Sequence, residues 1–168
     1  TCTFTVIVSD QTAPGITCPA NTTVAGGANC SATLANYAAS VTATDNCAAN
    51  PNETQSPVAG TTITGTQIVT ITATDAASNM STCSFTVTVA DQTAPSITCP
   101  ANTTVAASAN CNATLANYAA SVTASDNCSS NPTETQSPAV GTTITGSQVV
   151  TLTATDAAGN TSTCSFTV

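Results

Sequence analysis

The sequence of 168 residues contains no lysine, arginine or histidine, and its eight acidic residues give it a formal net charge of −8 at pH 7. Because no side chain is cationic, the carboxylates have no side-chain partner for a salt bridge. Nucleic acids and anionic membrane surfaces are normally bound through Lys and Arg. The composition therefore argues against both as partners.

The same absences limit enzyme chemistry. The chain lacks the usual general base, the amine needed for a Schiff base and the usual cationic clamp for an anion. Catalysis by two carboxylates needs a cleft and a raised pKa on one of them, and no sequence pattern marks such a cleft. We therefore expect a protein that is not an enzyme and that requires no cofactor.

Aromatic residues make up only 3% of the chain, and tryptophan is absent. A core of Ala, Val, Ile and Leu is a weak source of stability for a small domain. No apolar run approaches the roughly 18 residues of a membrane-spanning helix, and no signal peptide is recognisable. We therefore expect no membrane insertion in this segment, and any targeting or anchoring sequence would lie outside it.

What the sequence does contain is a repeat of 81 residues. Residues 1–81 align with residues 82–162 without a gap, and 63 of the 81 positions are identical. Self-similarity at a fixed period of this kind indicates a tandem array. We interpret residues 1–9 as the last strand of a preceding repeat, residues 10–90 as the first complete repeat and residues 91–168 as the second.

The nine cysteines follow this period. Four cysteines per repeat, with no histidine and no Cys-x-x-Cys spacing, favour disulfides over zinc. Disulfides persist in oxidising compartments outside the cytosol, so we expect an extracellular protein. The equivalent positions are Cys18 and Cys99, Cys30 and Cys111, Cys47 and Cys128, and Cys83 and Cys164, with Cys2 as a further copy of Cys83.

Short segments rich in Thr, Val and Ile alternate apolar with polar residues, as in Phe4, Val6 and Val8. This period of two indicates β-strands, and clusters of Gly, Pro, Asn and Asp separate the segments. About seven short strands per repeat predict an antiparallel β-sandwich, with Tyr37 and Tyr118 as core or corner residues. In the first repeat we expect strands near 2–9, 15–18, 22–25, 30–37, 53–57, 61–64, 66–74 and 82–89.

Five motifs in this order resemble the HYR, or hyalin repeat, domain: DQTAPGITCPANTTV, ATLANY, ATDNC, ITGTQIVTITATDAASN and TCSFTVTV. In two copies they cover essentially the whole chain. HYR domains are Ig-like modules that occur in tandem in extracellular adhesion proteins and in very large bacterial surface adhesins. The resemblance implies an all-β fold, namely tandem Ig-like antiparallel β-sandwiches with intradomain disulfides in a rod-like array.

The Ig-like fold implied by this resemblance also favours one disulfide pairing. It brings the first and last strands of a sandwich together at one pole. The alternative of Cys18 with Cys30 and Cys47 with Cys83 stays open, because four cysteines allow three pairings. The favoured bonds are Cys18–Cys83 and Cys30–Cys47 in the first repeat, and Cys99–Cys164 and Cys111–Cys128 in the second.

The acidic residues suggest a calcium site at the start of each repeat. In the sandwich, Asp45 and Asp75 would lie at the pole that the linker Asp10–Pro14 reaches. Three carboxylates without a cation repel one another, and Ca²⁺ takes carboxylate, amide and carbonyl oxygens, so Asn46 and Asn79 could add ligands. The alternative is that each Asp only caps its own turn. The candidate ligands are Asp10, Asp45 and Asp75, and Asp91, Asp126 and Asp156.

The function expected from these features is structural. We expect the stalk or filament body of a secreted or cell-surface adhesin, whose partners are neighbouring HYR repeats, other copies in a filament, or cell-surface and glycan groups. The proline of the linker limits flexing between repeats. Two alternatives remain, namely a carbohydrate- or surface-binding module and a passive spacer of a secreted enzyme.

Overall fold

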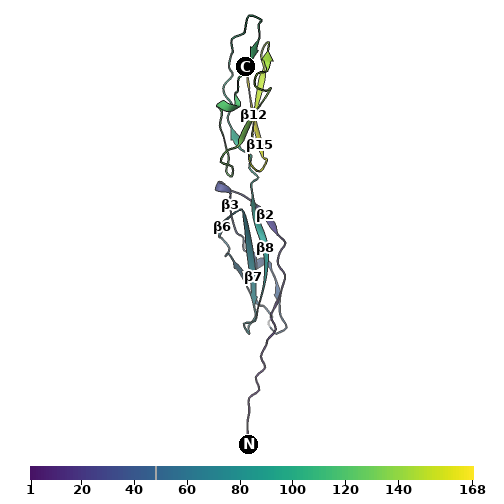
Figure 1. The fold of residues 1–168 in the computed structure, drawn as a ribbon. Coiled ribbons are helices and arrows are strands. Elements are labelled where there is room, and N and C mark those ends of the chain that lie inside the picture. The colour runs from purple at the N-terminus through teal and green to yellow at the C-terminus, as the bar shows by residue number, and fades with distance from the viewer. Residues whose placement is uncertain (48) are drawn as a thin grey trace. The chain divides into compact units, whose positions relative to one another are not determined.

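The computed structural model describes residues 1–47 and 49–168, and its regular structure is almost entirely β-strand (Figure 1). The chain divides into two compact units. Unit 1 comprises Thr1–Ala25 and Ser31–Ala90, and unit 2 comprises Gly26–Cys30 and Asp91–Val168. Helical structure in the described residues is limited to the 3-10 turns η1 (Ala28–Cys30), η2 (Ala38–Ser40) and η3 (Ala119–Ser121).

The main sheet of unit 1 has the strand order β2-β8-β7-β5. Strands β7 and β8 are its longest members and pair antiparallel along their length, whereas β2 pairs parallel with the end of β8. Figure 1 shows β2, β8 and β7 side by side. The four strands are β2 (Thr22–Ala25), β5 (Asn52–Ser56), β7 (Thr66–Thr74) and β8 (Met80–Ala90).

Two short ladders form the second layer of unit 1. Strand β1 (Gly15–Ile16) pairs with β4 (Ala43–Thr44), and β3 (Ser31–Thr33) pairs with β6 (Thr62–Thr64), both antiparallel. Residues of these ladders pack against apolar residues of the main sheet in one core. Unit 1 is therefore a sandwich of two layers.

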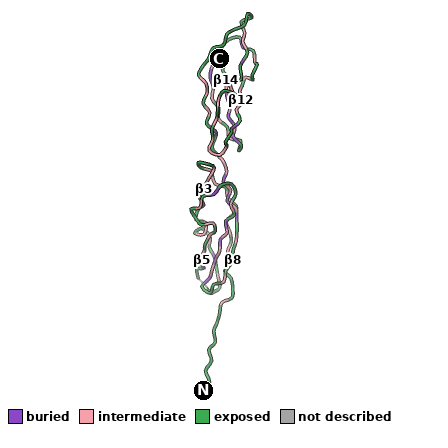
Figure 2. The backbone as a smooth tube through the Cα atoms, turned by 60° about the vertical axis from the view of Figure 1, so that its left-hand side comes forward, coloured by how far each residue is buried: buried purple, intermediate pink, exposed green. Residues whose placement is uncertain are grey.

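The core of unit 1 follows the alternation seen in the sequence. Val69, Ile71 and Ala73 on β7 are fully buried, while Ile68 on the opposite face is 61% exposed. The same alternation of buried and more exposed residues runs along β8 (Figure 2). An edge-on contact of Tyr37 with Phe85, at 5.0 Å between ring centroids, closes the core, and confirms the core position predicted for this tyrosine.

Unit 2 repeats this arrangement. Its main sheet has the order β12-β14-β15, and β9 pairs with β11 while β10 pairs with β13. Tyr118 packs edge-on against Phe166 at 5.0 Å. The predicted all-β sandwich is thus confirmed in both units. The strands are β9 (Ser96–Ile97), β10 (Ala113–Thr114), β11 (Ala124–Ser125), β12 (Thr133–Ser137), β13 (Thr143–Ile144), β14 (Val149–Thr155) and β15 (Thr161–Thr167).

Two strand predictions were wrong. Residues 2–9 form no strand, and Phe4 is 86% exposed (Figure 2), although the equivalent Phe85 on β8 is buried. Phe85 is paired with Val69 on β7, and the chain has no residue 81 positions before Val69 to pair with Phe4. The strand predicted at 30–37 is only β3, because the chain after Thr33 turns away to bond with Gln55.

Candidate metal site and disulfides

Three aspartates meet at one end of unit 1. Asp10 precedes β1, Asp45 follows β4 and Asp75 follows β7, and each offers a carboxylate oxygen within 4.8 Å of the others. In unit 2 the equivalent residues Asp91, Asp126 and Asp156 meet in the same way. The structure therefore brings together both predicted sets of three carboxylates.

Asp75 is the most buried member of the first triad, with 6% of its surface exposed. Its two oxygens accept hydrogen bonds from the backbone and side-chain nitrogens of Asn79, at 2.8 and 2.7 Å. Burial raises the pKa of Asp75, but these bonds and backbone donors at Ala77 and Ser78 outweigh it, so the net pKa is lowered. Asp75 therefore stays charged although it is buried.

The other two carboxylates also bond within their own turns. Asp10 accepts a hydrogen bond from the Thr12 amide at 3.0 Å, and Asp45 accepts one from the Cys47 amide at 2.8 Å. The turn-capping predicted as the alternative role is thus present at every member of the triad. Partial burial, followed by the charges of Asp10 and Asp45, raises the pKa of the Cys47 thiol.

The second triad has the same bonds. Asp156 is held by Asn160, and burial raises its pKa less than these bonds lower it. Backbone amides of Cys128 and Ser129 lower the pKa of Asp126. The Thr93 amide lowers the pKa of Asp91, but partial burial and the charges of Asp126 and Asp156 raise it further, so the net pKa is raised. Repulsion within the triad is therefore concentrated on Asp91.

The predicted linker Asp10–Pro14 is bound to unit 1. Pro14 is buried, and its carbonyl oxygen accepts a hydrogen bond from the Ser81 hydroxyl at 2.5 Å. The side chain of Asn79 also donates to the Asp10 carbonyl oxygen at 3.3 Å. The carboxylate of Asp10 is thus placed by hydrogen bonds to the turn and start of β8.

Two of the disulfides join the beginning of a repeat to its last long strand. Cys18–Cys83 lies in unit 1 and Cys99–Cys164 in unit 2, each with 5.6 Å between Cα atoms. These are bonds that the Ig-like resemblance implied. Cys18 and Cys83 also pack against the apolar core of unit 1.

The expected bonds Cys30–Cys47 and Cys111–Cys128 are not those of the structure. Cys30 bonds to Cys128, with 4.5 Å between Cα atoms, and both residues belong to unit 2. Cys47 and Cys111 are exposed free thiols, as is Cys2. The reason is that Gly26–Cys30 turns away from the strands beside it and packs with unit 2, where Asn127 donates to the Gly27 carbonyl oxygen at 2.9 Å.

Sequence reasoning missed a glutamine that fixes the loop after β3. Gln55 on β5 accepts bonds from the amides of Tyr37 and Ala38 and donates to the carbonyls of Ala35 and Pro57. Gln136 makes the four equivalent bonds in unit 2. The motif ETQS recurs in both repeats, but nothing in it shows that the glutamine reaches a loop about 18 residues earlier in the chain.

Comparison with known families identifies both repeats. The model of the HYR domain matches residues 9–89 and again residues 90–168. The chain therefore belongs to the HYR family, as its motifs predicted. No curated protein matches the sequence.

Among solved structures, the human desmocollin-1 ectodomain is similar over 96% of this chain, with 14% sequence identity and a TM-score of 0.35. The chain spans 37% of the length of that ectodomain. No helix among the described residues has the length and apolarity needed to cross a membrane. Family membership and the disulfides together indicate an extracellular repeat segment of the adhesion type.

Proposed function

We propose that this chain is a load-bearing spacer, a part of the stalk or filament body of a cell-surface or secreted adhesin, and that it performs no catalysis. The observation that carries the proposal is the bond from Cys18 to Cys83, repeated as Cys99–Cys164. Each bond closes a loop with a sequence separation of 65 residues. A force applied through the two ends of a repeat would pass through the disulfide and leave most of the sandwich unloaded.

The same bond adds stability that the aromatic-poor core does not provide. Closing a loop of this length restricts the unfolded chain and is worth about 4 kcal/mol in the loop-entropy model. A repeat held in this way refolds readily after partial extension, because the cysteines stay together. This property suits a spacer more than a binding module.

The threonine-rich faces also support a structural role. The hydroxyls of Thr70 and Ser84 on β7 and β8 hydrogen-bond to each other at 2.9 Å, and those of Thr151 and Ser165 do so at 3.0 Å. Cross-strand pairs of this kind stabilise a sheet. Because these hydroxyls bond to each other, they are less available for an ice, crystal or glycan surface.

Pulling single molecules from the two ends tests the proposal. With the disulfide intact, unfolding of unit 1 should release the 16 residues of the 81-residue period that lie outside the separation of 65, which is about 54 Å at roughly 3.4 Å per residue. After reduction the whole period should extend, by about 270 Å. Cys18→Ser should give the long extension at unit 1 without reduction, and the bond in unit 2 is the internal control.

A glycan array and a particle-binding assay on the same chain test the main alternative. A spacer should give no saturable binding in either assay. Saturable binding that Thr70→Ala or Thr151→Ala abolishes would replace the spacer with a surface-binding module. Full-length extension of a non-reduced repeat would contradict the load-bearing role itself.

We further propose that each aspartate triad binds Ca²⁺ and thereby fixes the start of its repeat. Three carboxylates lie within 4.8 Å in a chain that has no cationic side chain to neutralise them. In the loop of the second triad, buried oxygens of Asp126 and Asn127 have no hydrogen-bond partner among the described residues. A bound cation would satisfy such oxygens, which are costly to bury alone.

Calorimetric titration with Ca²⁺ after chelation tests this site, and we expect one ion per unit and a higher melting temperature with Ca²⁺. Asp91→Asn should remove the binding heat of unit 2 alone. Glu134→Gln is the matched control, because it also removes one negative charge but lies outside the triad and keeps an oxygen to accept from the Ala124 amide. No heat and no shift in melting temperature at millimolar Ca²⁺ would show that the aspartates only cap their turns.

A further inference from the structure

Two exposed free cysteines occupy the same repeat positions as the two members of the bond Cys30–Cys128. Cys111 is 81 residues after Cys30, and Cys47 is 81 residues before Cys128. The chain thus carries one bonded pair and one unbonded copy of each partner. The bonded pair joins the first sequence repeat to the second.

Each free cysteine has the local conformation of its bonded equivalent. Cys30 and Cys111 have φ angles of 53° and 54°, in the left-handed region, and each amide donates to the residue three positions earlier. Because this conformation is uncommon for a residue other than glycine, its recurrence at Cys111 is not accounted for by a bond there. Cys111 is therefore already arranged as Cys30 is in its disulfide.

Cys47 is arranged like Cys128 in the same sense. The amide of Cys47 donates to Asp45 at 2.8 Å, and that of Cys128 donates to Asp126 at 2.8 Å. The side chain of the preceding asparagine lies against each sulfur, with 3.2 Å from Asn46 to Cys47 and 3.3 Å from Asn127 to Cys128. Both halves of a second bond of this type are therefore preformed.

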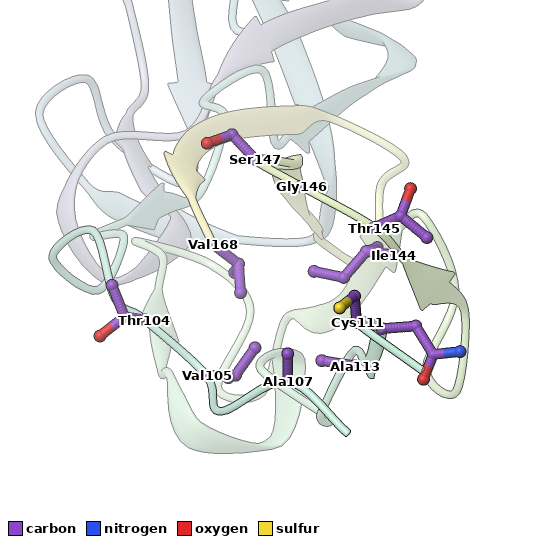
Figure 3. A pocket seen from close by; sticks show the side chains of 11 residues that line it. Thr104, Val105, Ala107, Cys111, Ala113, Ile144, Thr145, Gly146, Ser147 and Val168 are labelled. Carbon is purple, nitrogen blue, oxygen red and sulfur yellow. The ribbon is translucent and has the colours of Figure 1, made fainter. Parts of the chain in front are cut away.

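A hollow beside Cys111 in unit 2 shows what else is unmatched at that end. The cavity has a volume of about 330 Å³, and Figure 3 shows Val105, Ile144, Gly146 and Val168 around it with the Cys111 sulfur at its edge. In unit 1 the equivalent place is filled. There Val89 pairs with Val24 on β2, donates to the Gly65 carbonyl oxygen at 2.8 Å and is 7% exposed.

The hollow therefore has the lining that receives an extended segment of the Thr88–Ala90 type in unit 1. The chain contains one other copy of that segment, Ile7–Ser9, which is unpaired. Val8 occupies the position of Val89 and is 95% exposed. The start of one copy of this sequence thus carries the residues that fit the hollow in unit 2 of another.

We propose that Cys111 and Cys47 are the two halves of a disulfide between consecutive HYR repeats, and that the partner is a further copy of this sequence continuing head to tail in the 81-residue register. Cys111 of one copy bonds to Cys47 of the next, as Cys30 bonds to Cys128, and Val8 of the next copy fills the hollow. The two thiols lose two protons and two electrons to a small-molecule disulfide such as oxidised glutathione, which is released as two thiols. This inference does not depend on the load-bearing role.

The test is a fusion of residues 1–162 directly to a second copy of residues 1–168, which keeps the register because residues 163–168 repeat residues 1–6. After equilibration in a glutathione buffer, free thiols are counted under denaturing conditions, and the bonds are mapped without reduction. Mapping uses Asp- and Glu-specific proteases, because the chain offers trypsin no site. From the bonds and free thiols of the single chain, we expect three free thiols and a peptide linking Cys111 of the first copy to Cys47 of the second.

Two other thiol counts would overturn the proposal. Five free thiols would mean that Cys111 and Cys47 do not bond although the register places them together. One free thiol would mean that bonds such as Cys30–Cys47 form within each repeat. Cys111→Ser in the first copy is the control, and it should give four free thiols and leave the Cys30–Cys128 bond of each copy intact.

Discussion

At the scale of single residues, amide side chains hold the loops that the short strands leave unpaired. Gln55 makes four hydrogen bonds with the backbone between Ala35 and Pro57, at 2.7 to 3.3 Å. Only a side chain with both a donor and an acceptor can satisfy two amides and two carbonyls at once. The loop after β3 is therefore held by hydrogen bonds in a chain that has no salt bridges to use.

Gln55→Glu should destabilise unit 1 by about 1–3 kcal/mol, because a carboxylate cannot donate to the carbonyls of Ala35 and Pro57. The penalty should shrink at acidic pH, where the introduced group protonates and becomes a donor. Urea unfolding at pH 7 and pH 4 measures both effects. Gln67→Glu is the matched control, because Gln67 donates only to the neighbouring Ile68 carbonyl, and an equal loss there would contradict the argument.

At the scale of elements, the alternation along β7 decides which residues carry the core. Ile71 is fully buried among residues of both layers, whereas Ile68 on the same strand is 61% exposed. The two isoleucines differ in the face of the sheet they occupy and share the same backbone pairing with β8. Burial, rather than strand propensity, therefore distinguishes them.

Ile71→Ala should cost about 2–5 kcal/mol, since it removes buried methyl groups and leaves a cavity. Ile68→Ala should stay within about 0.5 kcal/mol, as is usual for a surface substitution. Chemical unfolding followed on the transition of unit 1 compares the two. Similar losses for both variants would show that the sheet, rather than the core, limits the stability of the unit.

At the scale of the whole molecule, the charge of −8 is carried without any cationic side chain. Three carboxylates, those of Asp75, Asp126 and Asp156, have pKa values below their ordinary value because hydrogen bonds favour their charged form. An acid with a lowered pKa in the fold stabilises it above the pKa of the unfolded chain. That stabilisation is lost as the pH falls through the folded-state pKa.

The melting temperature should therefore change little between pH 8 and pH 5 and fall below about pH 4, where unfolded carboxyls begin to protonate. Monovalent salt should have only a weak effect, because no side-chain salt bridge exists to be screened. Calorimetric scans across this range measure both, with Asp156→Asn expected to reduce the loss at low pH. A steep loss between pH 8 and pH 5 would contradict the assignment to these aspartates.

The period, the β-sandwich and the aspartate triads could be predicted because each depends on local pattern. Alternation along β7 and β8 marks the buried face, and the turns after β4 and β7 carry Asp45 and Asp75 to the same end. The strand at 2–9 could not be predicted correctly, since a strand also needs a partner. The sequence of Phe4, Val6 and Val8 alternates like that of β8, yet the partner strand β7 has no copy before it.

The sequence by itself determined that the repeats fold alike, because 63 of 81 positions are identical and the same contacts recur in both units. Only the tertiary structure decided that Cys30 bonds while Cys111 does not, and that Cys128 bonds while Cys47 does not. Each pair has nearly the same local sequence and the same backbone hydrogen bonds. The difference lies in what packs beside each cysteine, since a disulfide forms only where the fold brings a second sulfur within reach.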